Sequence, residues 1–182
     1  MRHLIAHLRT KGVEAVILAN FEVQGNRKCC QVDFVAVTRN YVSLHEHKEF
    51  NGILKGSHNG PWKTLRGGDW IDIPRPNPHG QALDAKFALS DAMENFANSV
   101  RGIPHPRDGK FFKEFDAAVV ISPDLECGSL VPRHGTPEGF KAFVCGEPEA
   151  MAILTTKKSS SSWRLEHWER FAIEFLGLKS VS

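Results

Sequence analysis

The stretch QVDFVAVTRNYVSLHEHKEF, Gln31–Phe50, decides the fold of this chain. It holds two runs, Val32–Thr38 and Tyr41–Lys48, that are rich in valine, phenylalanine, tyrosine and leucine. Such residues suit the pleated, half-buried surface of a sheet. The step Arg39-Asn40 between the two runs can turn the chain, so the stretch predicts a β-hairpin.

The apolar positions of this hairpin fix its register, because they must share one buried face. In that register Val37 lies opposite Val42 and Val35 lies opposite Leu44. The next positions on this face are charged: Asp33, Glu46 opposite it, and Lys48 two residues beyond Glu46.

Two like charges directly opposite each other destabilise a sheet, so a pair of carboxylates beside an apolar core needs a bridging group. A divalent cation between Asp33 and Glu46 is the plain candidate. The alternative is that both are exposed strand residues, with Lys48 forming a surface ion pair that contributes little.

Length and composition indicate one globular domain spanning residues 1–182. The 182 residues can bury a core without disulfides or metals, and 41% hydrophobic and 24% charged residues are ordinary values. A net charge of +2 permits nucleic-acid binding without arguing for it.

Several features predict a cytoplasmic setting. The longest apolar runs, such as Ala15–Ala19 and Ala117–Ile121, are too short to span a bilayer, and the basic, histidine-containing N-terminus is unlike a secretory signal. The four cysteines lack zinc-ligand spacing and the density of a disulfide scaffold.

The segment Asn51–Pro76 is rich in glycine and proline and predicts a loop. Its basic and aromatic residues of interest are Lys55, Lys63, Arg66, Trp62 and Trp70. Together they can bind a phosphate backbone and stack on bases. The two tryptophans can instead cover an edge of the core.

A long helix is predicted to begin at Asn77-Pro78, because asparagine is a favoured N-cap and proline suits the first helical position. Apolar residues follow at helical spacing, so this helix should lie on the sheet. Gln81 falls in its first turn, where its side chain can point toward the strand ends or merely remain solvated.

The remaining elements are assigned from periodicity and turn residues. They are a helix over residues 2–10, strands at Val13–Val23, Phe115–Ser122 and Gly139–Cys145, a short helix or strand at Met151–Leu154, and a helix at Trp163–Leu178.

The order Asp33, Glu46, any residue, Lys48 resembles the motif of the restriction-endonuclease-like PD-(D/E)xK nuclease superfamily. The segments VDFVAVT, SLHEHKEFNG and NPHGQ, with the glycine-rich loop around Trp62, more specifically resemble the nuclease-related domain, NERD, over roughly residues 4–100. This resemblance implies an α/β fold with a mixed central sheet flanked by helices, to which residues 101–182 add strands and a C-terminal helix.

The resemblance also implies a metal-dependent DNA endonuclease. Asp33, Glu46 and the backbone carbonyl of His47 would hold Mg²⁺ or Mn²⁺. Lys48 would orient or activate the attacking water, and Gln81 would be an accessory catalytic residue on the helix. These residue types suit phosphodiester hydrolysis, which needs a cation to stabilise developing charge and to supply hydroxide.

One departure from the family pattern keeps other functions open. The family commonly opens its first helix with Gly-Glu, and no such pair precedes Leu4, while Glu14 lies at a strand entry. The alternatives are a weakly active domain that binds nucleic acid or a protein without cutting, and an accessory domain whose helicase- or kinase-type partner supplies the main activity.

Overall fold

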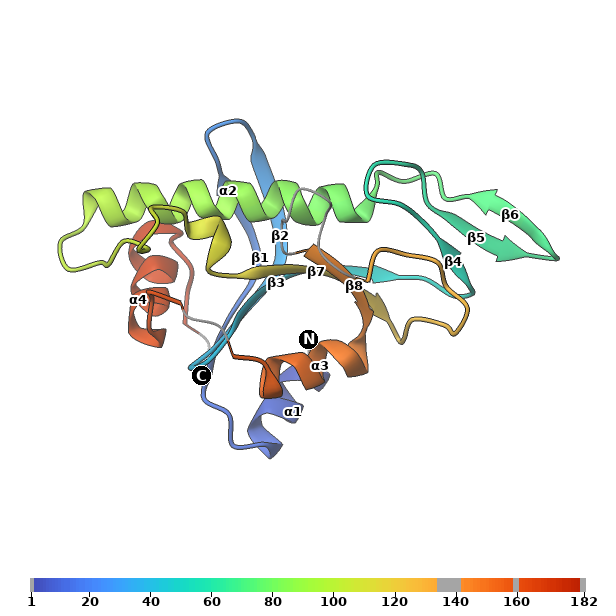
Figure 1. Ribbon diagram of the computed structural model, residues 1–182. Helices are drawn as coiled ribbons and strands as arrows, with labels where there is room; N and C mark the ends of the chain where they lie inside the picture. Colours follow the sequence, from blue (N-terminus) through green and yellow to red (C-terminus); the bar gives the residue numbers. More distant parts are fainter. Residues whose placement is uncertain (1, 134–141, 159–160, 181–182) are drawn as a thin grey trace.

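The computed structural model describes residues 2–133, 142–158 and 161–180, which form an α/β fold around a mixed five-stranded sheet (Figure 1). The sheet order is β1-β2-β3-β7-β8. Its strands are β1 (Ala15–Gln24), β2 (Cys29–Thr38), β3 (Val42–Glu49), β7 (Asp116–Ser122) and β8 (Ala142–Gly146). The first three strands are antiparallel, and β7 and β8 continue parallel to β3. The expected restriction-endonuclease-like architecture is therefore confirmed.

Helices cover both faces of this sheet (Figure 1). The long helix α2 (Pro78–Ser99) runs along one face, beginning at the predicted Asn77 cap. The helices α1 (Arg2–Thr10) and α3 (Glu147–Thr156) pack on the other face, so Met151–Leu154 is helical. Within the described ranges, none of the helices combines the length and apolarity needed to cross a bilayer.

The predicted register of the central hairpin is confirmed: Val37 pairs with Val42 and Val35 with Leu44. These four side chains are at most 1% exposed and belong to the core beneath α2. Phe34 on the alternate positions packs instead against the α1 side. The face that ends in the three charged residues is therefore the α2 face.

Side-chain alternation reverses in the first hairpin at Asn20. Leu18 and Phe21 both join the core under α2, although they are three residues apart and would otherwise face opposite sides. Asn20 has a φ of 52°, a left-handed conformation that asparagine tolerates better than most residues. Asn20 lies opposite Asp33, between the pairs Ala19–Phe34 and Phe21–Val32. The strands therefore change face directly beside Asp33.

Beyond this reversal the β1–β2 hairpin crosses α2 (Figure 1). Gly25 approaches Ala88 so closely that a Cβ on it would lie 2.7 Å from the Ala88 Cα. The Asn26 amide donates to Asp91 Oδ2 at 2.8 Å, which fixes the hairpin tip to the helix.

The segment predicted as a loop, Asn51–Pro76, contains a second sheet, so that prediction was wrong. Its strands are β4 (Leu54–Lys55), β5 (Lys63–Arg66) and β6 (Asp69–Asp72), all antiparallel. We call residues 54–72 the wing, because in Figure 1 they extend away from the main sheet. The strands escape sequence analysis because they are short, mostly polar and separated by glycines.

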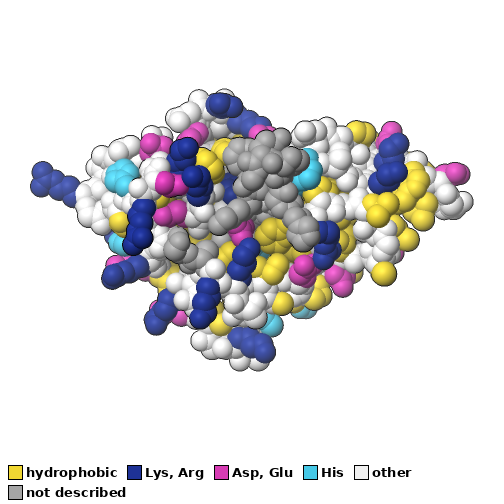
Figure 2. Space-filling view, in the orientation of Figure 1, with side chains coloured by type: hydrophobic (Ala, Val, Ile, Leu, Met, Phe, Trp, Pro, Cys, Tyr) yellow, Lys and Arg dark blue, Asp and Glu magenta, His cyan; other side chains and the backbone are white. Residues whose placement is uncertain are grey.

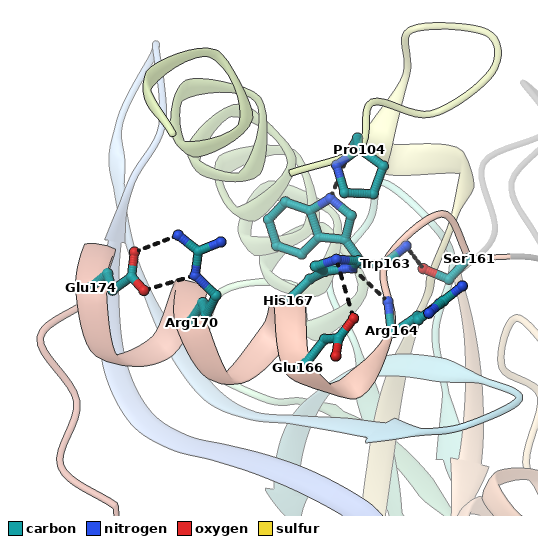
Figure 3. A network of polar contacts seen from close by, with 8 residues as sticks. All are labelled: Pro104, Ser161, Trp163, Arg164, Glu166, His167, Arg170 and Glu174. Carbon is teal, nitrogen blue, oxygen red and sulfur yellow. Dashed lines mark hydrogen bonds and ion pairs between the residues drawn. The ribbon is translucent and has the colours of Figure 1, made fainter. Parts of the chain in front are cut away.

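The C-terminal segment holds a polar network of its own, and Trp163 connects it to Pro104 in the loop after α2 (Figure 3). Trp163 Nε1 donates to the Pro104 carbonyl at 2.9 Å, and its ring packs on Phe96 of α2. The predicted helix over Trp163–Leu178 is shorter, with α4 (Leu165–Arg170) passing into a π-helical segment, Phe171–Phe175. The strand expected at Gly139–Cys145 is β8 from Ala142 onward, and residues 139–141 lie outside the described part of the chain.

Candidate functional site

Asp33 connects β2 to β3 through its side chain. The ladder between the strands ends at the pair Phe34–His45. Beyond it the His47 amide donates to Asp33 Oδ2 at 2.7 Å, so the carboxylate acts where a backbone carbonyl would continue the ladder. Asp33 is therefore held against β3 beside Glu46.

Glu46 and Lys48 form a close ion pair on β3. The distance from Lys48 Nζ to Glu46 Oε1 is 2.5 Å, and the two side chains are only 18% and 8% exposed. Burial raises the pKa of Glu46, Lys48 partly offsets that rise, and the nearby charge of Asp33 adds to it. The folded protein thus leaves the charge of the Glu46 carboxylate incompletely compensated.

The structure brings together Asp33, Glu46 and Lys48, the three residues that the hairpin register placed on one face, and the backbone of His47, which the family resemblance added. These groups offer two carboxylates and a carbonyl, which are the hard oxygen donors that Mg²⁺ and Mn²⁺ prefer. Among the described residues no group of three His, Cys, Asp or Glu side chains is arranged to hold a metal. An ion here would therefore keep several waters, as Mg²⁺ usually does in proteins.

Gln81 is less closely associated with this cluster. It lies in the first turn of α2, on the helix that covers the same face of the sheet, and is partly exposed. No hydrogen bond joins its side chain to Asp33, Glu46 or Lys48. Its accessory role stays a prediction.

Glu14 does not replace the missing acid of the first helix. It precedes β1 and pairs with Arg39 at 3.0 Å, where both side chains are largely exposed. Arg39 belongs to the β2–β3 turn, which precedes the start of β3, whereas Glu46 lies toward the end of that strand. The helix α1 itself, RHLIAHLRT, carries no acidic residue.

The reverse side of β3 contains a polar contact that sequence reasoning missed. His47 Nε2 lies 2.9 Å from Oε1 of Glu147, the first residue of α3. Burial raises the pKa of Glu147, but hydrogen bonds from His47 and Ser122 outweigh it and leave the pKa below its usual value. This contact braces the backbone segment that carries the His47 carbonyl. The Glu-Pro step after a strand was the only sequence signal for it.

The basic residues predicted to bind nucleic acid lie on the wing but not on one face. Lys55 is directly opposite Lys63, whereas alternation along β5 puts Arg66 on the other face. Lys63 pairs with Asp72 at 3.0 Å. The three cations therefore cannot contact one phosphate run together.

Asn77 links the wing to α2. Sequence analysis predicted only its role as the cap of the helix. Its Oδ1 accepts from the amides of His79 and Gly80 at 2.8 and 3.2 Å, as an N-cap should. Its Nδ2 also donates to three carbonyls in the β4–β5 connection. These belong to Ser57, His58 and Gly60, at 3.0, 3.0 and 2.8 Å.

Comparison with known proteins identifies the family of the chain. The sequence model of the nuclease-related domain, NERD, matches residues 1–122, a range that contains Asp33, Glu46, Lys48, the wing and α2. No curated protein and no solved structure matches the chain significantly. Because the family match covers more than half of the sequence, the chain belongs to the nuclease-related domain family.

Proposed function

We propose that this domain is a metal-dependent DNA endonuclease that hydrolyses phosphodiester bonds. The observation that supports the proposal best is the cluster at the end of β3, where Asp33 accepts from the His47 amide and Lys48 lies 2.5 Å from Glu46. Asp33 and Glu46 are like charges, which oppose sheet stability, and Lys48 offsets the charge of Glu46 only in part. A bound cation would therefore relieve a repulsion that the protein side chains leave in place.

Asp33, Glu46 and the His47 carbonyl would hold Mg²⁺ or Mn²⁺. When bound, such an ion supplies positive charge for the phosphate and lowers the pKa of a coordinated water. The pKa of Glu46 is already raised by burial, so a cation would stabilise its ionised form.

Lys48 has a different role because an ammonium cannot ligate a cation. Glu46 holds its ammonium in place, and there Lys48 would orient the attacking water and stabilise charge that develops in the transition state. Its contribution should therefore be larger in the transition state than in the ground state.

A second candidate function is nucleic-acid binding without cleavage. It is favoured by the absence of an acidic residue on α1 and by the existing Lys48–Glu46 pair, which partly offsets the charge of one of the two expected metal ligands. In this function the same residues would stabilise the hairpin only.

The deciding experiment incubates supercoiled plasmid with the protein in Mg²⁺ or Mn²⁺, with and without chelator. Nicking that requires the metal is the expected result. Pure protein that nicks in neither metal, yet still binds DNA, would leave the non-cleaving function as the better description.

Lys48→Ala then tests the site itself in single-turnover cleavage of a labelled duplex at saturating metal. Cleavage should fall by roughly a hundredfold or more, while DNA affinity measured in Ca²⁺ changes little. Lys48→Arg should not rescue cleavage, because a guanidinium stays charged. Lys28→Ala is the matched control, since that lysine of the β1–β2 turn forms an exposed ion pair with Asp84 of α2 and not with the site carboxylates. Wild-type cleavage by Lys48→Ala would remove Lys48 from the mechanism.

A further inference from the structure

Trp70 differs from the other three tryptophans of the chain. Trp62, Trp163 and Trp168 are at most 3% exposed, whereas Trp70 is 36% exposed. It lies on β6, an edge strand of the wing, far from the aromatic cluster around α4. Core packing therefore accounts for the three buried rings and not for Trp70.

The wing face that carries Trp70 also carries uncompensated positive charge. Lys55 and Lys63 face each other directly across β4 and β5, an arrangement that is destabilising by itself. Asp72 neutralises Lys63, but Lys55 has no carboxylate partner among the described residues. The Lys55 ammonium lies 5.7 Å from the centre of the Trp70 ring.

The wing is attached firmly enough to present this face as a fixed surface. Its first strand is bonded to Leu130, with the Leu130 amide donating to the Leu54 carbonyl at 2.7 Å. The Asn77 amide holds the β4–β5 connection. In Figure 2 hydrophobic side chains lie beside basic ones at the wing end of the molecule, at the right of the view.

An exposed aromatic ring beside two lysines is the arrangement that binds single-stranded nucleic acid: bases stack on the ring and phosphates contact the cations. A duplex does not offer base faces for stacking, because its bases already stack on one another. An acidic peptide would satisfy the lysines but would not use the ring as a stacking platform.

We propose that the wing face formed by Lys55, Lys63 and Trp70 binds single-stranded DNA, with a base on the Trp70 indole and adjacent phosphates at the two lysines. This inference rests on the proposed nuclease function and narrows its substrate to DNA with an unpaired segment. The residues between Glu49, which ends β3, and Leu54, which begins β4, are few. The wing therefore follows directly in the chain from the strand that carries Glu46.

Intrinsic fluorescence tests this proposal directly, because Trp70 is the only exposed tryptophan. The protein is titrated in EDTA, which prevents cleavage, with oligothymidylate of about 12 nucleotides, a typical site size. The duplex of the same length and poly-glutamate serve as competitors. Quenching of the exposed tryptophan by the single strand, with tighter binding than to the duplex, is the expected result.

Three variants identify the contact. Because the Trp70 variants lack the reporter indole, their affinity is measured by the anisotropy of a labelled oligothymidylate. Trp70→Ala should weaken single-strand binding by roughly fivefold to a hundredfold, the effect of losing one stacked base. Trp70→Phe should retain most of the affinity. Ile71→Ala is the matched control: Ile71 is the next residue on β6, 48% exposed, and points from the opposite face of the wing.

The proposal is overturned if Trp70→Ala binds the single strand like wild type, if the duplex binds equally well or better, or if poly-glutamate competes as efficiently as DNA. These outcomes are independent of the plasmid assay. A protein that nicks plasmid but shows no Trp70-dependent binding keeps the nuclease function and loses this inference. A protein that shows Trp70-dependent binding but no metal-dependent nicking keeps the single-strand binding face and loses the nuclease function.

Discussion

Asn77 offers the sharpest test of how the wing is held to the body of the molecule. One amide group performs two tasks, because Oδ1 caps α2 and Nδ2 donates to carbonyls of the β4–β5 connection. Asn77→Ala removes both tasks, whereas Asn77→Asp removes only the second. Aspartate and asparagine are comparable helix caps, so capping alone predicts a stable Asn77→Asp protein.

The structure gives the size of each effect. Losing the cap costs about 1 kcal/mol, and each of the two Nδ2 hydrogens contributes about 0.5–1.5 kcal/mol net. Asn77→Ala should therefore lose roughly 2–4 kcal/mol, a fall in Tm of roughly 5–15 °C for a chain of this size. Asn77→Asp should be no more stable than Asn77→Ala, because its carboxylate would face the carbonyls of Ser57, His58 and Gly60.

The assay is thermal unfolding of the three proteins beside hydrogen exchange of peptides from residues 54–72. Both variants should show faster exchange in the wing, since the Nδ2 contacts hold it. The Trp62 indole still donates to the Ser57 carbonyl at 3.2 Å, so the connection should loosen without unfolding completely. An Asn77→Asp protein with wild-type Tm and wild-type wing exchange would refute the reasoning.

Three further predictions concern the site and the wing. A divalent ion at 100 times its Kd should stabilise the wild type by about 2.7 kcal/mol, and Asp33→Asn, whose amide oxygen can still accept from His47, should lose most of that gain in calorimetry. Lys55→Ala and Lys63→Ala should each lower the slope of log affinity for DNA against log salt concentration by roughly one unit. Arg66→Ala should lower it only if the opposite wing face also binds DNA. Unchanged slopes in all three variants would show that the wing does not contact DNA. Because the pKa of Glu46 is raised, the folded state favours the protonated carboxyl group. Without metal, the stability that Glu46 contributes is therefore fully present below its pKa in the unfolded chain, and it is lost as the pH rises through its pKa in the folded protein. Glu46→Gln should flatten this part of the unfolding profile, and an unchanged profile would contradict the shift.

The hairpin and α2 could be predicted because their signals are local and redundant. One register places Val35, Val37, Val42 and Leu44 together on one face, and a one-residue slip would move two of them to the opposite face of the sheet. Asn77-Pro78 marks a helix start by two independent preferences. From this register the association of Asp33, Glu46 and Lys48 follows without knowledge of the rest of the fold.

The wing and the contacts of individual polar groups could not be predicted in this way. Strands of two to four residues, such as Leu54–Lys55, are too short to show alternation. The bond from His47 to Asp33 depends on where the β2–β3 ladder stops, and the contact of His47 with Glu147 joins residues 100 positions apart. Such contacts depend on how separate elements pack, which no local pattern records.

The parallel pairing of β3 with β7 has a consequence for how the chain folds. The two strands are brought together across the wing and α2, and the bond between the Tyr41 hydroxyl and Asp116 at their start joins residues 75 positions apart. Closing so long a segment is entropically costly and slow, whereas the β1–β2–β3 meander closes through short turns. The charged residues at the end of β3 are thus assembled early from local sequence. The strand that shields their backbone from water arrives only after about two thirds of the chain has been synthesised.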